Sequence, residues 1–163
     1  MRWLPVLTFA AAIGSGLVAG VFFGFSSFVM KALGRLPTGK GVEAMQSINI
    51  AAVTPAFMLV FMGTALAALA LGVAVIPRLN ETGARLVLAG GLIYLIGVFG
   101  VTVWGNVPMN DALAKLSPGS QEAATYWPRY LSGWSLWNHA RTAASLLSLV
   151  LYILALRIGN ANS

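Results

Sequence analysis

The polar side chains best suited to chemistry gather at the start of the last long apolar stretch of this chain. Asn138, His139 and Arg141 stand together there, and His139 is the only histidine among 163 residues. An ionisable side chain facing lipid at full depth costs roughly 2.5 to 3.5 kcal/mol, so such residues turn towards a cavity or towards partners. An imidazole beside a guanidinium and an amide can remove an acidic proton and stabilise the resulting anion. We therefore expect a catalytic site built on these three residues.

Four apolar stretches must position this site. Each has about the 20 residues that a helix needs to cross the hydrocarbon core, and together they cover residues 5–28, 51–76, 84–104 and 134–156. The chain is 58% hydrophobic and only 9% charged, whereas soluble domains have about 25% charged residues. The sequence therefore predicts an all-α fold. It is a single integral membrane domain over residues 1–163, a four-helix bundle with short extra helices in its loops.

Helical patterns also occur outside the four spans. A helix is expected from about Val42 into the second span, and Pro55 should kink it because proline removes one backbone hydrogen bond. The long connection between the third and fourth spans predicts two short helices, over residues 110–116 and 121–126. The second of these should end before Pro128.

Four spans place both termini on one side of the membrane and the first and third loops on the other. Basic residues are nearly balanced between the two sides, but Arg2, Arg78 and Arg85 lie close to span ends in short segments. By the positive-inside rule they favour cytoplasmic termini, in a bacterial inner membrane. The net charge of +6 is spread as single residues, which is typical of contact with a lipid bilayer. The chain lacks the clustered basic face that nucleic-acid binding requires.

Other polar and aromatic residues reach the same end of the bundle as His139, and we expect them to bind substrate. They are Gln46, Asn49, Trp104, Asn106, Asn110, Tyr130 and Trp137. Aromatic rings form good walls for a flat apolar molecule. A structural role stays open for each type, because asparagines cap helices and tryptophans and tyrosines form belts at the membrane interface. Likewise, a histidine can bond a backbone carbonyl and an arginine can reach out to headgroups.

Ligands for a metal are scarce. The chain has no cysteine, and the carboxylates on the side of His139 are Glu43, Asp111 and Glu122. A copper or di-iron centre needs several histidine or carboxylate ligands, so we expect no metal and no cofactor. Haem is the alternative, because His139 alone can supply an axial ligand.

A ridge of small residues marks the first span. Gly16, Gly20 and Gly24 are each four residues apart, a spacing that lets another helix approach closely. The ridge fits helix packing within the chain. It also offers a contact for a homo-oligomer, in which several histidines could be pooled into one metal site.

Four motifs of this chain resemble the anthrone oxygenase-like family of small four-helix membrane proteins. They are GVFFGFSSFVM at 20–30, AMQSIN at 44–49, NVPMN at 106–110 and WSLWNHART at 134–142. The resemblance covers nearly the whole chain in the right order. It implies a monooxygenase that converts anthrones to anthraquinones with dioxygen, without metal or flavin.

The function expected from the residues agrees with this resemblance. A small apolar aromatic substrate, flat and acidic at its methylene carbon, would lose a proton to His139 and pass an electron to dioxygen directly. Arg141, Asn138 and Asn106 are assigned here to the stabilisation of the enolate oxygen. The alternative is a non-enzymatic membrane protein that binds haem, quinone or lipid at the polar mouth of the bundle.

Overall fold

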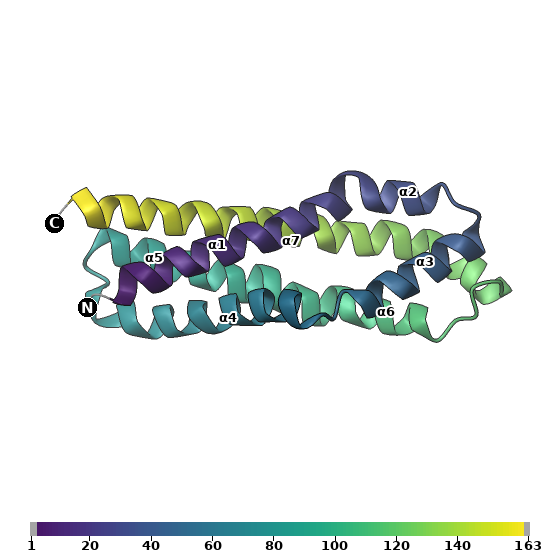
Figure 1. The fold of residues 1–163 in the computed structure, drawn as a ribbon, viewed down its shortest axis with the longest axis horizontal. Coiled ribbons are helices and arrows are strands. Elements are labelled where there is room, and N and C mark those ends of the chain that lie inside the picture. Colours follow the sequence, from purple (N-terminus) through teal and green to yellow (C-terminus); the bar gives the residue numbers. More distant parts are fainter. Residues whose placement is uncertain (1–2, 162–163) are drawn as a thin grey trace.

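The chain forms a long bundle of helices. The computed structural model describes residues 3–161, and that part of the chain contains no strand. Both ends of the chain lie at the same end of the bundle (Figure 1). Four helical stretches are long and apolar enough to cross a membrane: Trp3–Gly34, Pro55–Arg78, Thr82–Ala114 and Gln121–Ile158. The predicted all-α, integral membrane bundle is confirmed.

The first stretch is a continuous helical rod of three parts. Helix α1 (Trp3–Gly24) passes into a π-helical segment, η1 (Phe25–Val29), and then into α2 (Met30–Gly34). The rod extends beyond the predicted end of the span at residue 28 because no helix-breaking residue interrupts it. A proline follows at Pro37, and the residue before a proline disfavours helix.

A separate helix, α3 (Thr38–Ala51), precedes the second stretch, which consists of α4 (Pro55–Val75) and a 3₁₀ turn, η2 (Ile76–Arg78). The expectation that Pro55 kinks a continuous helix is wrong, because Pro55 begins a new helix. Thr54 caps α4 by accepting a hydrogen bond from the backbone N–H of Phe57 at 3.3 Å. Proline suits the first position of a helix because the missing N–H has no partner there.

The third stretch is interrupted by π-helical geometry. Helix α5 (Thr82–Ile93) leads into η3 (Tyr94–Gly100) and η4 (Thr102–Asn106), and α6 (Val107–Ala114) follows. The short helix expected at 110–116 is thus present but begins three residues earlier. Its start at Val107 places the next residue, a proline, in the first turn, where it is tolerated.

The fourth stretch is a single helix, α7 (Gln121–Ala161), of 41 residues. The expectation that a separate short helix ends before Pro128 is wrong. An internal proline costs about 3 kcal/mol, whereas each large side chain that is fully buried contributes about 1.5 to 3 kcal/mol. Trp127 and Tyr130, which flank the proline, are both buried, and their packing keeps the helix continuous.

Helix α7 is longer than a membrane is thick. Its 41 residues span about 60 Å at the α-helical rise, twice the hydrocarbon core of about 30 Å. Its first half packs with α2, α3 and α6 at the end of the bundle remote from the termini (Figure 1). The loops of the predicted bundle are therefore folded into a helical extension at that end of the bundle.

Three buried apolar clusters follow one another along the chain's helices. One contains Leu4, Leu71, Val87 and Tyr152, the next Val18, Phe22, Phe61 and Tyr94, and the third, in the extension, Met45, Leu113, Trp127 and Trp134. Large apolar side chains also cover the outside of α1 and α4, including Val6, Phe9, Leu59 and Leu66. Exposed apolar side chains of this kind suit a surface that faces lipid.

The glycine ridge of α1 contributes little to this packing. Helix α1 approaches α4 at Gly14, where an added Cβ would overlap Thr64 Oγ1. By contrast, a Cβ at Gly20 would meet no atom within 4 Å, and one at Gly16 would make ordinary contact with Leu149.

Candidate functional site

Arg141 lies buried near the middle of α7 and is only 4% exposed. Its Nη2 donates to Asn138 Oδ1 at 2.8 Å, and its Nη1 donates to Thr102 Oγ1 at 3.3 Å. The guanidinium carbon lies 4.0 Å from the centre of the Phe22 ring and 5.1 Å from that of Trp134. No carboxylate within residues 3–161 pairs with it. An uncompensated cation in an apolar interior favours an anion nearby.

Asn138 connects Arg141 to the first helical rod. Its side chain is fully buried, and its Nδ2 donates to the Phe22 carbonyl oxygen and to Ser26 Oγ, each at 2.8 Å. Ser26 belongs to the π-helical segment η1, and Thr102 begins the π-helical segment η4. Such segments occur frequently at functional sites, and here two of them supply hydroxyls to one cluster.

Ser26 is the hub of this cluster. Its Oγ lies 2.8 Å from Asn138 Nδ2, 2.8 Å from His139 Nδ1 and 3.1 Å from Thr142 Oγ1. The Thr142 hydroxyl donates its proton to the Asn138 carbonyl at 2.8 Å, so Ser26 must donate to Thr142. His139 Nδ1 is then a donor to Ser26, because each hydroxyl has one proton. This assignment puts the lone pair of the neutral imidazole on Nε2.

His139 faces outward into an open groove between the first helical rod and α7. The groove has a volume of about 490 Å³ and is lined by Ser26, Met30, Lys31, Gly34, Arg35, Leu131, Ser135 and His139. Among residues 3–161, no side chain is hydrogen-bonded to His139 Nε2. The imidazole can therefore present an unprotonated nitrogen to a molecule in the groove.

Asn106 lies on the inner side of the same cluster and is 1% exposed. Its Nδ2 donates to the Trp134 carbonyl oxygen at 3.2 Å. Its Oδ1 and Arg141 Nε are buried atoms without a hydrogen-bond partner among the described residues. Trp134 contacts both residues, since its ring centre also lies 5.1 Å from the Arg141 guanidinium carbon.

Three of the predicted substrate contacts form a hydrogen-bond network in the extension. Asn110 Oδ1 accepts from Tyr130 Oη at 2.7 Å and from Trp134 Nε1 at 2.8 Å. Asn49 Nδ2 donates to Tyr130 Oη at 3.4 Å. The rings of Trp127, Tyr130 and Trp134 stack along α7, with centre distances of 5.6 and 6.3 Å. Trp134 therefore joins this network to the Arg141 cluster.

The remaining predicted contacts lie apart from the His139 groove. Gln46 Nε2 donates to the carbonyls of Leu113 and Leu116, each at 2.9 Å, and so holds the end of α6. Trp104 is 79% exposed and Trp137 is 43% exposed, and neither lines the groove.

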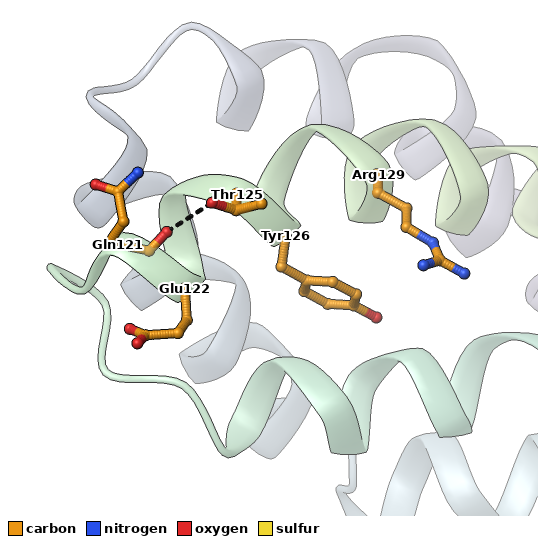
Figure 2. Close-up of a pocket in the computed structure, with 5 residues that line it drawn as sticks. All are labelled: Gln121, Glu122, Thr125, Tyr126 and Arg129. Carbon is orange, nitrogen blue, oxygen red and sulfur yellow. Dashed lines mark hydrogen bonds between the residues drawn. The ribbon is translucent and has the colours of Figure 1, made fainter.

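No carboxylate of residues 3–161 joins the site. Lys40 donates a hydrogen bond to Glu43 at 2.8 Å and holds the pKa of that exposed carboxyl below its ordinary value. Glu122 lies in a second pocket of about 410 Å³, which Gln121, Thr125, Tyr126 and Arg129 complete (Figure 2). In the described part of the chain, no three histidine, cysteine or carboxylate side chains come together as metal ligands.

Ser26 and Thr102 contact the candidate site residues, and reasoning from the sequence missed both. Both are hydroxyl residues inside apolar stretches, where an unpaired polar group is costly. That signal is weak, because a hydroxyl can also bond the carbonyl one turn back in its own helix. Thr102 also does this, donating to the Val98 carbonyl at 2.8 Å.

A family model described as anthrone oxygenase matches residues 57–151, more than half of the chain. The matched region contains Thr102, Asn106, Asn138, His139 and Arg141. No curated protein and no solved structure matches the chain.

Proposed function

Because the chain belongs to the anthrone oxygenase family, we propose that it is a membrane-embedded oxygenase that acts on an anthrone-like or polycyclic phenolic substrate. The methylene carbon of the substrate becomes a carbonyl carbon. One atom of dioxygen becomes the carbonyl oxygen, the other leaves as water, and no cofactor takes part.

The observation that carries this proposal is the setting of His139. Its ring lies in an open groove, its Nδ1 is held by Ser26 at 2.8 Å, and its Nε2 has no partner among residues 3–161. A general base needs a free lone pair and a fixed orientation. His139 has both.

The reaction begins with proton transfer from the methylene carbon of the substrate to His139 Nε2. The carbanion gives one electron to dioxygen, the two radicals combine to a peroxide anion, and His139 returns the proton to it. His139 then removes the second methylene proton while the O–O bond breaks and hydroxide leaves. The carbonyl group forms, and the hydroxide takes up this proton as water.

Arg141 and Asn138 support the base from behind. Asn138 fixes Ser26, and Arg141 fixes Asn138, so this chain of hydrogen bonds holds the imidazole in place. The uncompensated charge of Arg141 also favours an anionic intermediate in the neighbouring groove. We assign Asn106 a positioning role through the Trp134 carbonyl, and Met30 and Leu131 supply apolar surface for the substrate.

Two further expectations belong to this proposal. We propose that both termini are cytoplasmic in a bacterial inner membrane. We also propose that a second copy can dock on the ridge of Gly16, Gly20 and Gly24, since Gly20 faces open space.

Oxygen uptake by the purified protein in lipid nanodiscs, with anthrone as the probe, tests the activity. We expect one dioxygen consumed for each anthraquinone formed, with label from ¹⁸O₂ in the new carbonyl. Empty nanodiscs give the rate of uncatalysed autoxidation. Uptake no faster than this background would contradict the proposal, and a Soret band or a stoichiometric metal would identify His139 as a ligand rather than a base.

A further inference from the structure

The groove beside His139 is lined by basic side chains and by no acidic side chain. The basic side chains are those of Lys31 and Arg35. Among residues 3–161, the ion pairs are Lys40–Glu43 and Arg78–Glu81, so neither cation of the groove is neutralised by a carboxylate. The two side chains are four residues apart, which places them on the same side of the helix.

The rest of the groove is laid out along its length. Ser26 and His139 stand at one end, and Arg35 follows nine residues after Ser26 along the first rod. Met30, Gly34 and Leu131 lie between them. Gly34 allows Leu131 to approach the first rod closely, since a Cβ there would stand 3.3 Å from Leu131 Cδ1. The groove therefore has imidazole and hydroxyl groups at one end, Lys31 beside Met30 in the middle, and Arg35 at the other end.

We infer that the groove binds a flat, apolar molecule that carries an anionic group, held by Lys31 and Arg35 while its ring oxygens reach Ser135 and His139. The identification of this ligand as the substrate rests on the proposed function. The inference narrows the class of substrates to polycyclic phenols that bear an acidic substituent. The volume of about 490 Å³ falls within the range of small-molecule sites.

The chemistry at the far end of the groove favours such a ligand over a phospholipid. A lipid phosphate satisfies the two cations equally well, but its acyl chain would leave the Ser135 hydroxyl and the imidazole without partners. Covering polar groups with hydrocarbon is unfavourable. A phenolic or quinoid ring offers oxygens to both the Ser135 hydroxyl and the His139 imidazole.

The second pocket provides a contrast within the same molecule. Its lining combines Glu122 with Arg129, and Figure 2 shows both side chains on the first turns of α7. It therefore lacks the one-sided charge of the groove. Arg129 is a matched control, because it is an arginine that lines a pocket of similar volume away from His139.

Equilibrium binding without turnover tests the inference. The probes are anthraquinone-2-carboxylate and its neutral counterpart 2-methylanthraquinone, offered to the full-length protein in zwitterionic nanodiscs. We expect the wild type to prefer the acid by about fivefold to tenfold, as two partly exposed charge contacts allow. The double variant Lys31→Gln, Arg35→Gln should lose this preference, and Arg129→Gln should keep it. Equal binding of both probes by the wild type, or an unchanged preference in the double variant, would overturn the inference.

Repeating the comparison in nanodiscs that contain phosphatidylglycerol separates the two sources of negative charge. Comparing the wild type with the double variant in the same discs removes the effect of surface potential. If anionic lipid abolishes the difference between the two proteins, the cations bind headgroups and the inference fails. Preference for the acid without any oxygen uptake would leave the binding site standing and reject the oxygenase, so the two proposals fail separately.

Discussion

Ser26 Oγ on the first helical rod lies 2.8 Å from His139 Nδ1 on the last helix, although 113 residues separate them in sequence. The same oxygen accepts from Asn138 Nδ2 at 2.8 Å. Because Ser26 gives its only proton to Thr142, the histidine must donate at Nδ1. One hydroxyl thus fixes which nitrogen of the only histidine faces the groove.

Replacement of His139 by glutamine should abolish most of the activity. Glutamine is able to keep a hydrogen bond to Ser26 but has no basic nitrogen, so oxygen uptake with anthrone should fall by about 10²- to 10⁴-fold. Helix content by circular dichroism and the elution volume in detergent should be unchanged. A folded His139→Gln protein with full activity would rule out the general-base mechanism.

Replacement of Ser26 by alanine should release the imidazole. We expect a loss of about tenfold to a hundredfold in kcat, because a misplaced base reacts poorly. In ¹⁵N spectra of the histidine ring, the population with the proton on Nδ1 should decrease. Ser27→Ala is the matched control, since Ser27 donates only to the Phe23 and Gly24 carbonyls of its own helix. Identical spectra for wild type and Ser26→Ala would contradict the tautomer assignment.

Replacement of Arg141 by lysine should lower the activity. An ammonium keeps the charge but loses the planar fork that reaches Asn138 and Thr102 together. Losing a hydrogen bond from a charged donor costs about 1.5 to 3 kcal/mol, so we expect at least about a tenfold loss of kcat. Arg129→Lys, in the second pocket, should retain the wild-type rate. Full activity in Arg141→Lys would show that Arg141 contributes only to packing.

Gln46 should stabilise the extension rather than bind substrate. Gln46→Ala removes two donors from the end of α6, which should lower the free energy of unfolding by about 1 to 2 kcal/mol. Amide hydrogen exchange should accelerate in α6 and remain slow in α4. Unchanged exchange combined with a raised KM would instead support the role first expected for Gln46.

Two glycines of α1 should respond in opposite ways to the same change. Gly14→Ala drives a methyl group into Thr64 on α4 and should cost about 1 to 3 kcal/mol. Gly20→Ala places its methyl group in open space and should gain about 0.5 to 1 kcal/mol in helix propensity. Thermal unfolding in the same detergent compares them. Equal destabilisation would show that Gly20 is covered by a partner, such as a second copy.

The sequence predicted the membrane bundle because hydropathy acts locally. Any segment of about 20 apolar residues must form a helix across the bilayer, where no water satisfies its backbone. The same local reasoning misjudged Pro55 and Pro128. Their effects depend on neighbours: Pro55 follows the capping residue Thr54, while Pro128 is flanked by the buried rings of Trp127 and Tyr130.

For the candidate site, the sequence alone determined which residues are too polar for lipid. Asn138, His139 and Arg141 were identifiable because a polar side chain in an apolar stretch is costly wherever it sits. Only the tertiary structure decided that Arg141 turns inward and His139 outward, and that Ser26 contacts both Asn138 and His139. These arrangements depend on π-helical turns and on contacts between helices remote in sequence, which no local periodicity encodes.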